Sequence, residues 1–203
     1  LESEDGALCE DITITNITQR DVYESPIFFR LGARLRGPKG TGNQSTVVGT
    51  LQRILVDNFV SYNNFSFVCF FIIGIPGYAI KDIKMSNIYI QHQGGDYADL
   101  VKVVPPEEVE KYPDPGMFGP MPAQGFFFRH VNNLELSHVE VAAMNPDPRP
   151  AFYLQDVNRA DFIAVTAPTA NPAFHLNKVT DLRILLSRAA KDTHMDTADD
   201  KTI

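Results

Sequence analysis

A short pattern in which apolar residues alternate with other residues returns five times along the chain. Copies of this pattern begin at Asp11, Arg53, Asp82, Asn133 and Asp181. Side chains that are apolar at every second position predict half-buried β-strands and not helices. Three copies carry an Asn at the same place, at Asn16, Asn58 and Asn87, and His138 replaces this Asn in a fourth copy. Because Asn tolerates the left-handed backbone region better than most residues, we expect the chain to turn at these positions.

A second pattern begins with phenylalanine and contains a valine at a fixed place. Its three copies are Phe126–Leu134, Phe152–Ala160 and Phe174–Leu182. Their valines lie 26 and 22 residues apart. Short strands that repeat at this period predict a solenoid, in which each turn of the chain buries its inner face by stacking on the next. We therefore predict an all-β parallel β-helix of about six coils. A β-sandwich is the alternative, although it does not require matched side chains at a fixed offset.

Two intervals between copies of the first pattern are longer than one coil needs. The first and second copies begin 42 residues apart, and the third and fourth begin 51 residues apart. The excess is glycine-rich in the first interval (Gly37–Ser45) and proline-rich in the second (Val104–Pro122). We expect two long loop insertions, which solenoids place on one face and often use for binding. Decoration of the surface without a function is the alternative.

The composition limits the classes of partner. Eighteen basic residues against 25 acidic ones give a formal net charge of −7, whereas a nucleic-acid-binding chain is usually basic. The longest apolar run, Phe67–Ile73, is far too short to span a bilayer. We therefore expect no nucleic acid and no membrane among the partners. With 44% hydrophobic residues the chain can build one core, and we predict a single β-helix domain over residues 1–196 and a polar tail over 197–203.

The basic residues are unevenly distributed. Between residues 25 and 56 the chain has no acidic residue and five basic ones, which are Arg30, Arg34, Arg36, Lys39 and Arg53. A positive patch on an acidic protein can attract one specific anion, and arginine suits bidentate recognition of a carboxylate. The alternative is that these arginines pair with acidic residues of neighbouring coils. The five histidines have no zinc-ligand spacing and no glycine-rich phosphate loop is present, so we predict no metal site and no cofactor.

Several longer stretches carry a resemblance to a known family. They are Cys9–Ile17, Pro26–Pro38, Gly74–Ile83, Ser86–Gly95 and Met117–Val131. On these stretches the chain, from about residue 8 to residue 196, resembles the C-terminal part of glycoside hydrolase family 28, the polygalacturonase-like enzymes. The resemblance implies a right-handed parallel β-helix, an acidic polysaccharide partner (galacturonate-containing pectin), inverting hydrolysis of the glycosidic bond and a periplasmic or secreted location.

The segments that carry catalysis in that family are absent from the chain. It has no Asn-Thr-Asp and no Gly-His-Gly segment, and in the family these lie upstream of the part that the chain resembles. The resemblance therefore implies no catalytic residue here, and we expect the chain alone to be inactive. It also implies that Arg30, Arg34 and Arg36 border the sugar sites, with Tyr78 where this branch has a histidine. The alternative function is a non-catalytic carbohydrate-binding or structural β-helix module.

Overall fold

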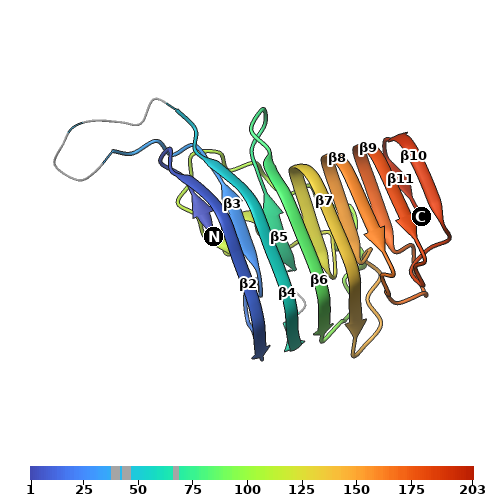
Figure 1. The fold of residues 1–203 in the computed structure, drawn as a ribbon. Helices are drawn as coiled ribbons and strands as arrows, with labels where there is room; N and C mark the ends of the chain where they lie inside the picture. Colours follow the sequence, from blue (N-terminus) through green and yellow to red (C-terminus); the bar gives the residue numbers. More distant parts are fainter. Residues whose placement is uncertain (38–41, 43–46, 66–68) are drawn as a thin grey trace.

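Strands make up most of the computed structural model, which describes residues 1–37, 42, 47–65 and 69–203 (Figure 1). Within these residues the strands are β1 (Glu2–Ser3), β2 (Leu8–Arg20), β3 (Phe28–Leu31), β4 (Thr50–Asn64), β5 (Phe70–Ile73), β6 (Ile80–His92), β7 (Phe126–Ala143), β8 (Phe152–Ile163), β9 (Phe174–Leu185), β10 (Thr193–Ala198) and β11 (Lys201–Thr202). Two short 3-10 helices, η1 (Ala98–Leu100) and η2 (Pro115–Phe118), lie between β6 and β7. The described strands form one sheet, in which only β10 and β11 pair antiparallel. The fold is therefore all-β with a mostly parallel sheet.

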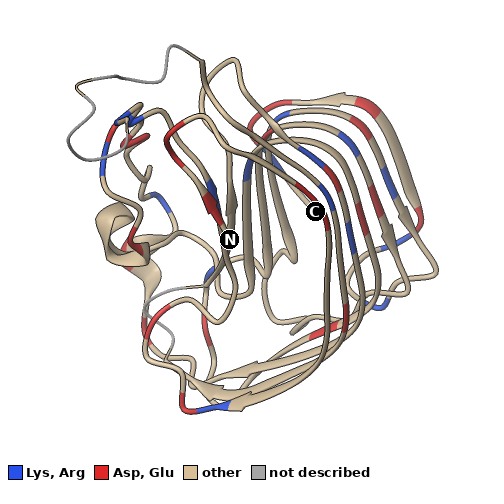
Figure 2. Cartoon of the chain, turned by 60° about the vertical axis from the view of Figure 1, so that its left-hand side comes forward, with Lys and Arg blue, Asp and Glu red and all other residues tan. Residues whose placement is uncertain are grey.

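The six long strands lie side by side in chain order, from β2 through β4, β6, β7 and β8 to β9 (Figure 1). Their register aligns the apolar positions Ile12, Ile54, Ile83, Leu134, Ala160 and Leu182. The short strands β1, β3 and β5 form a second parallel row, which the first residues of β7, β8 and β9 continue. Figure 2 shows successive turns of the chain one behind another around a shared interior. This arrangement is compatible with a parallel β-helix, whereas the sheets of a β-sandwich are antiparallel.

The residues that end each alternation have the predicted backbone conformation. The φ angle is 59° at Asn16, 53° at Asn58, 52° at Asn87 and 54° at His138. The register of the flanking residues aligns these four positions across β2, β4, β6 and β7. A residue in the left-handed region redirects an extended chain, so neighbouring long strands bend at matching positions. The predicted turns are thus confirmed at all four residues.

Apolar side chains fill the interior, stacked strand upon strand. Phe126, Phe152 and Phe174 are fully buried and aligned across β7, β8 and β9. Their rings stack at centroid distances of 5.8 Å and 4.9 Å. Burial of a side chain of this size contributes about 1.5–3 kcal/mol, so the aligned repeats supply the main stabilising term.

The second insertion, Val104–Pro122, covers the outside of the short strands. Phe118 and Met121 pack in an apolar cluster with Phe71 of β5, and the Phe118 and Phe71 rings meet edge-on at 5.9 Å. As a result all four residues of β5 are buried, so both of its faces are covered. Most of the first predicted insertion lies outside the described residues, and Lys39 lies there too.

The two ends of the sheet differ. At one end β10 and β11 pair antiparallel with β9, so the segment expected as a polar tail, 197–203, lies partly in strands against the sheet. At the other end no described strand pairs with the outer edge of β2. The apolar side chains Leu8 and Ile17 of this edge are 65% and 37% exposed. No helix among the described residues is long and apolar enough to cross a membrane.

The open edge of β2 favours pairing with another chain, because its backbone groups and inward-facing side chains lack a covering strand. We expect self-association that increases with concentration in sedimentation velocity. Ile17→Lys places a charge in line with the buried Phe59, and we expect it to reduce the association. Thr18→Lys, on the outward side of β2, is the matched control and should leave it unchanged. A chain that stays monomeric at every concentration contradicts this prediction.

Candidate functional site

A pocket opens where the first short strands end. It has a volume of about 270 Å³ and is lined by Glu2, Ser3, Glu4, Asp5, Ala7, Arg34, Tyr112 and Pro113. We call it the Glu4 pocket. Its walls come from β1 and the residues after it, from the residues that follow β3, and from the second insertion. Because Arg34 is one of the predicted sugar-binding residues, the pocket is the candidate site.

Arg30 lies behind this pocket and not on its surface. Its side chain is fully buried, and Nη1 donates to the carbonyl of Gly74 at 3.0 Å. Nη2 donates to the carbonyls of Glu107 and Glu108 at 3.1 Å and 2.9 Å. The guanidinium also lies over the ring of Phe118, 5.3 Å from its centroid. Arg30 therefore fixes the second insertion to the sheet, which differs from its predicted contact with a sugar.

Arg34 is held by Asp5. Its Nε donates to Asp5 Oδ1 at 3.1 Å, and a second, shorter bond joins Nη2 to Oδ2. These hydrogen bonds lower the pKa of Asp5 below its ordinary value, so Asp5 stays ionised. The ring of Tyr112, which is 69% exposed, lies 5.4 Å from the Arg34 guanidinium carbon. The Arg34–Asp5 ion pair thus holds one positive and one negative charge in place, next to the exposed ring of Tyr112.

The basic stretch is largely neutralised by acidic residues from the start of the chain. Arg30 faces Glu4, Arg34 binds Asp5, and Arg53 pairs with both Glu10 and Asp11. This matches the alternative in which the arginines pair with acidic residues on neighbouring turns.

Arg36 is the predicted arginine whose side chain stays open. It is exposed, its backbone N–H donates to Asp5 Oδ1 at 2.9 Å, and its guanidinium forms no ion pair with the described residues. Tyr78 is 50% exposed and lies in a hairpin, where its N–H donates to the carbonyl of Ile75 at 2.9 Å. Tyr78 does not line the Glu4 pocket. The structure therefore places Arg34 in the lining of the pocket and Arg36 next to it through the backbone contact with Asp5, whereas Tyr78 is not part of the lining.

Glu4 is the residue of this site that sequence reasoning missed. Its side chain is 5% exposed, and Oε1 lies 3.5 Å from Arg30 Nε. Neither carboxyl oxygen has a hydrogen-bond partner among the described residues. Burial raises the pKa of Glu4 from 4.5 to about 7, although Arg30 and Arg34 oppose that rise. A buried carboxyl with a raised pKa in a concave pocket is a frequent mark of a functional site.

Gly32 makes room for the Glu4 carboxyl. A Cβ atom at Gly32 would lie 2.0 Å from Glu4 Oε2, closer than any real contact allows. No motif surrounds Glu4 in the sequence. Glu4 could have been identified from the sequence only if its contact with Gly32, 28 residues later, had been known.

A histidine ties the second insertion to the sheet beside the pocket. His130 Nδ1 lies 2.6 Å from Asp156 Oδ2, and His130 Nε2 lies 3.2 Å from Glu107 Oε2. Next to it, Arg129 donates to the carbonyls of Pro105 and Pro106, each at 2.8 Å. These bonds hold the part of the insertion that leads to Tyr112. They thereby help to position Tyr112 and Pro113, which the second insertion contributes to the pocket.

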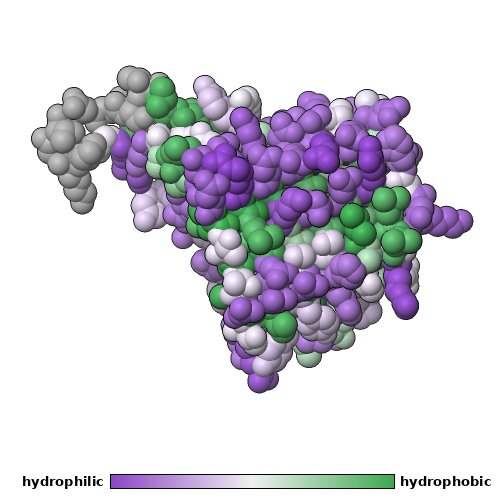
Figure 3. Space-filling view, viewed as in Figure 1, coloured by the Kyte–Doolittle hydropathy of each residue, from purple (hydrophilic) through white to green (hydrophobic). Residues whose placement is uncertain are grey.

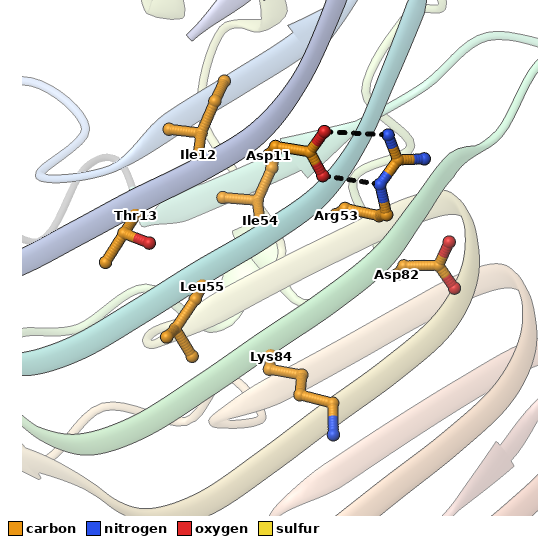
Figure 4. A pocket seen from close by; sticks show the side chains of 8 residues that line it. All are labelled: Asp11, Ile12, Thr13, Arg53, Ile54, Leu55, Asp82 and Lys84. Atoms are coloured by element: carbon orange, nitrogen blue, oxygen red, sulfur yellow. Dashed lines mark hydrogen bonds and ion pairs between the residues drawn. The ribbon is translucent and has the colours of Figure 1, made fainter.

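A larger hollow lies outside the long strands. It has a volume of about 430 Å³ and is lined by Asp11, Ile12, Thr13, Arg53, Ile54, Leu55, Asp82 and Lys84 (Figure 4). Its charged side chains already have partners, in the pairs Asp11–Arg53, Asp82–Asn133 and Lys84–Glu135. The surrounding face is mostly hydrophilic, with interspersed hydrophobic side chains (Figure 3). With its charges satisfied, this hollow is a weaker candidate than the Glu4 pocket.

No family model matches the chain, and no curated protein and no solved structure matches it either. Among the described residues, no group of three or more His, Cys, Asp or Glu side chains could hold a metal ion.

Proposed function

We propose that the chain is the C-terminal β-helix part of a polygalacturonase-like, pectin-directed glycoside hydrolase and that it binds galacturonate units at the Glu4 pocket. The observation that carries this proposal is the exposed side chain of Arg36, which forms no ion pair with the described residues and whose backbone N–H donates to Asp5, a residue that lines the Glu4 pocket together with Arg34. Galacturonate carries one carboxylate on each sugar, and an unpaired arginine is the side chain best suited to bind it.

The finer fold belongs to the same proposal. Six long parallel strands in register, each joined to or continued from a short parallel strand, correspond to six coils of a right-handed β-helix. Parallel strands joined by crossovers are right-handed in nearly all proteins, which supports this hand. The second insertion then lies outside the short-strand face and forms one wall of the binding pocket.

The contacts of a sugar follow from the chemistry of the pocket. The carboxylate of galacturonate pairs with Arg36, and the sugar hydroxyl groups donate to Asp5, which Arg34 keeps ionised. The exposed face of Tyr112 covers the apolar side of the sugar ring. Because the chain carries a net charge of −7, attraction of this polyanion is local and weakens with added salt.

Catalysis is assigned to residues outside this chain. Inverting hydrolysis needs two carboxyl groups roughly 6.5–9.5 Å apart on either side of the glycosidic bond. Asp5 is bound by Arg34, which favours a binding role for it and supports the second candidate function, a non-catalytic carbohydrate-binding module. The chain alone should release no reducing sugar from polygalacturonate, in keeping with either candidate. A secreted or periplasmic location would bring the protein to its polysaccharide.

Removal of the open guanidinium tests the binding proposal. Arg36→Ala should weaken binding of trigalacturonate about fivefold in isothermal titration calorimetry, as expected for one exposed ion pair. The loss should shrink as salt is raised. Arg183→Ala removes an exposed arginine from β9 and serves as the control, with unchanged affinity expected. Equal affinity of the Arg36→Ala variant and the wild type would remove Arg36 from the site.

A further inference from the structure

The carboxyl group of Glu4 is the one feature of the pocket that the proposed contacts leave unexplained. Both oxygens are buried, and they have no hydrogen-bond partner among the described residues. Arg30 Nε lies at ion-pair distance, 3.5 Å from Oε1, but a carboxyl group remains costly to bury when its oxygens accept no hydrogen bond. It lines the pocket, so a bound molecule can supply the missing partner.

We propose that Glu4 meets an anionic sugar in its protonated form, donates its O–H to the sugar carboxylate, and thereby couples ligand binding to the uptake of one proton. This proposal rests on the proposed function of the pocket. The step is a protonation: an acid of the solvent or buffer gives up a proton, an O–H bond forms on the Glu4 carboxyl, and this O–H donates a hydrogen bond to the ligand carboxylate, whose own bonds stay intact.

A bound anion adds negative charge next to Glu4 and so favours its protonated form. Arg30, which faces Glu4 from β3, and Arg34, from the residues that follow β3, act in the opposite sense and favour the carboxylate. Glu2 and Asp5 contribute negative charge from the same side of the pocket. With Glu4 ionised, a ligand carboxylate would enter beside three carboxylates. With Glu4 protonated, one of these charges is gone and a hydrogen-bond donor takes its place, as in sites where two carboxyl groups share one proton.

Among the described residues, the second insertion lines the pocket with Tyr112 and Pro113 and so adds no further acid to its wall. The exposed Arg36 is joined to Asp5 through its backbone N–H. The Glu4 carboxyl occupies the space that a side chain at position 32 would fill, so the glycine there leaves room for it in the wall of the pocket. The raised pKa of about 7 places the change within a range that is easily measured.

The expected result is a binding constant that depends on pH. Trigalacturonate should bind the wild-type chain roughly tenfold more weakly at pH 8 than at pH 6, because only the protonated form of Glu4 binds well. Calorimetry in buffers of different ionisation enthalpy should show uptake of close to one proton at pH 8. Galactotriose, which lacks the carboxylates, should show neither effect.

Two variants decide the assignment. Glu4→Gln is nearly isosteric and permanently uncharged, so its affinity should not change with pH and it should take up no proton. Glu2→Gln removes a carboxylate from the same pocket but leaves Glu4 able to titrate, so its affinity should still fall with rising pH and it should still take up a proton. Persistence of the pH dependence in Glu4→Gln would overturn the proposal, as would the absence of proton uptake in the wild type. If the wild type fails to bind trigalacturonate at pH 6, the proposed function fails, and this proposal fails with it.

Discussion

Arg149→Met is expected to lower the free energy of unfolding by about 3–5 kcal/mol, because it leaves a buried carboxylate without its partner. The side chains of Arg149 and Asp147 are both 0% exposed. Arg149 Nε and Nη2 donate to the two carboxylate oxygens of Asp147 at 3.0 Å and 2.6 Å. Nη1 donates to the carbonyl of Met121 in the second insertion at 3.1 Å. The variant would thus weaken the insertion as well as the ion pair.

Urea denaturation at pH 7 measures this loss. Arg183→Met is the matched control, because Arg183 is 54% exposed and its loss should change stability by no more than about 0.5 kcal/mol. In the double variant Arg149→Met, Asp147→Asn the loss should fall well short of the sum of the two single losses, since neither partner is then left charged. A loss below about 1 kcal/mol for Arg149→Met would show that the pair contributes little to stability.

The repetitive part of the fold could be predicted from the sequence, because its cause is local. Alternation of side chains sets strand formation, and an Asn at a fixed place sets the left-handed turn, as at Asn58 and Asn87. The stacking partner of each strand carries the same pattern, so the register follows from aligning the repeats. The same logic gives the buried Phe152 and Phe174 as neighbours in the core.

The site could be predicted only in part, because its charges are decided by residues far apart in the sequence. Arg30 looks available in the sequence, yet the insertion that buries it contributes Glu107 and Glu108, more than 70 residues later. The pairing of Arg34 with Asp5 likewise spans 29 residues. Grouping basic residues by sequence window therefore could not show that, of the arginines in this window, Arg30, Arg34 and Arg53 have acidic partners while Arg36 forms no ion pair with the described residues.

Stability should depend on pH through two buried groups whose effects have opposite signs. The pKa of Glu4 is raised from 4.5 to about 7. Its contribution to the free energy of unfolding is therefore complete below pH 4.5 and is lost as the pH rises through 7. The change corresponds to about 3 kcal/mol. Burial lowers the pKa of His92 from 6.5 to about 4. Its contribution is therefore complete above pH 6.5 and is lost as the pH falls toward 4.

Between pH 4.5 and 6.5 the two effects oppose each other, so the wild-type chain should vary less in stability than either variant. In the Glu4→Gln variant only the effect of His92 remains of these two, so the stability of this variant should rise with pH in this window by up to about 3 kcal/mol. In the His92→Gln variant only the effect of Glu4 remains of these two, so the stability of this variant should fall with rising pH by a similar amount. The sign of each slope, taken from urea denaturation at several pH values, is the test. Glu2→Gln should keep the wild-type slope. Slopes of the same sign in the Glu4→Gln and His92→Gln variants would contradict the assignment, because carboxylates such as Asp5, with a lowered pKa, titrate below this window.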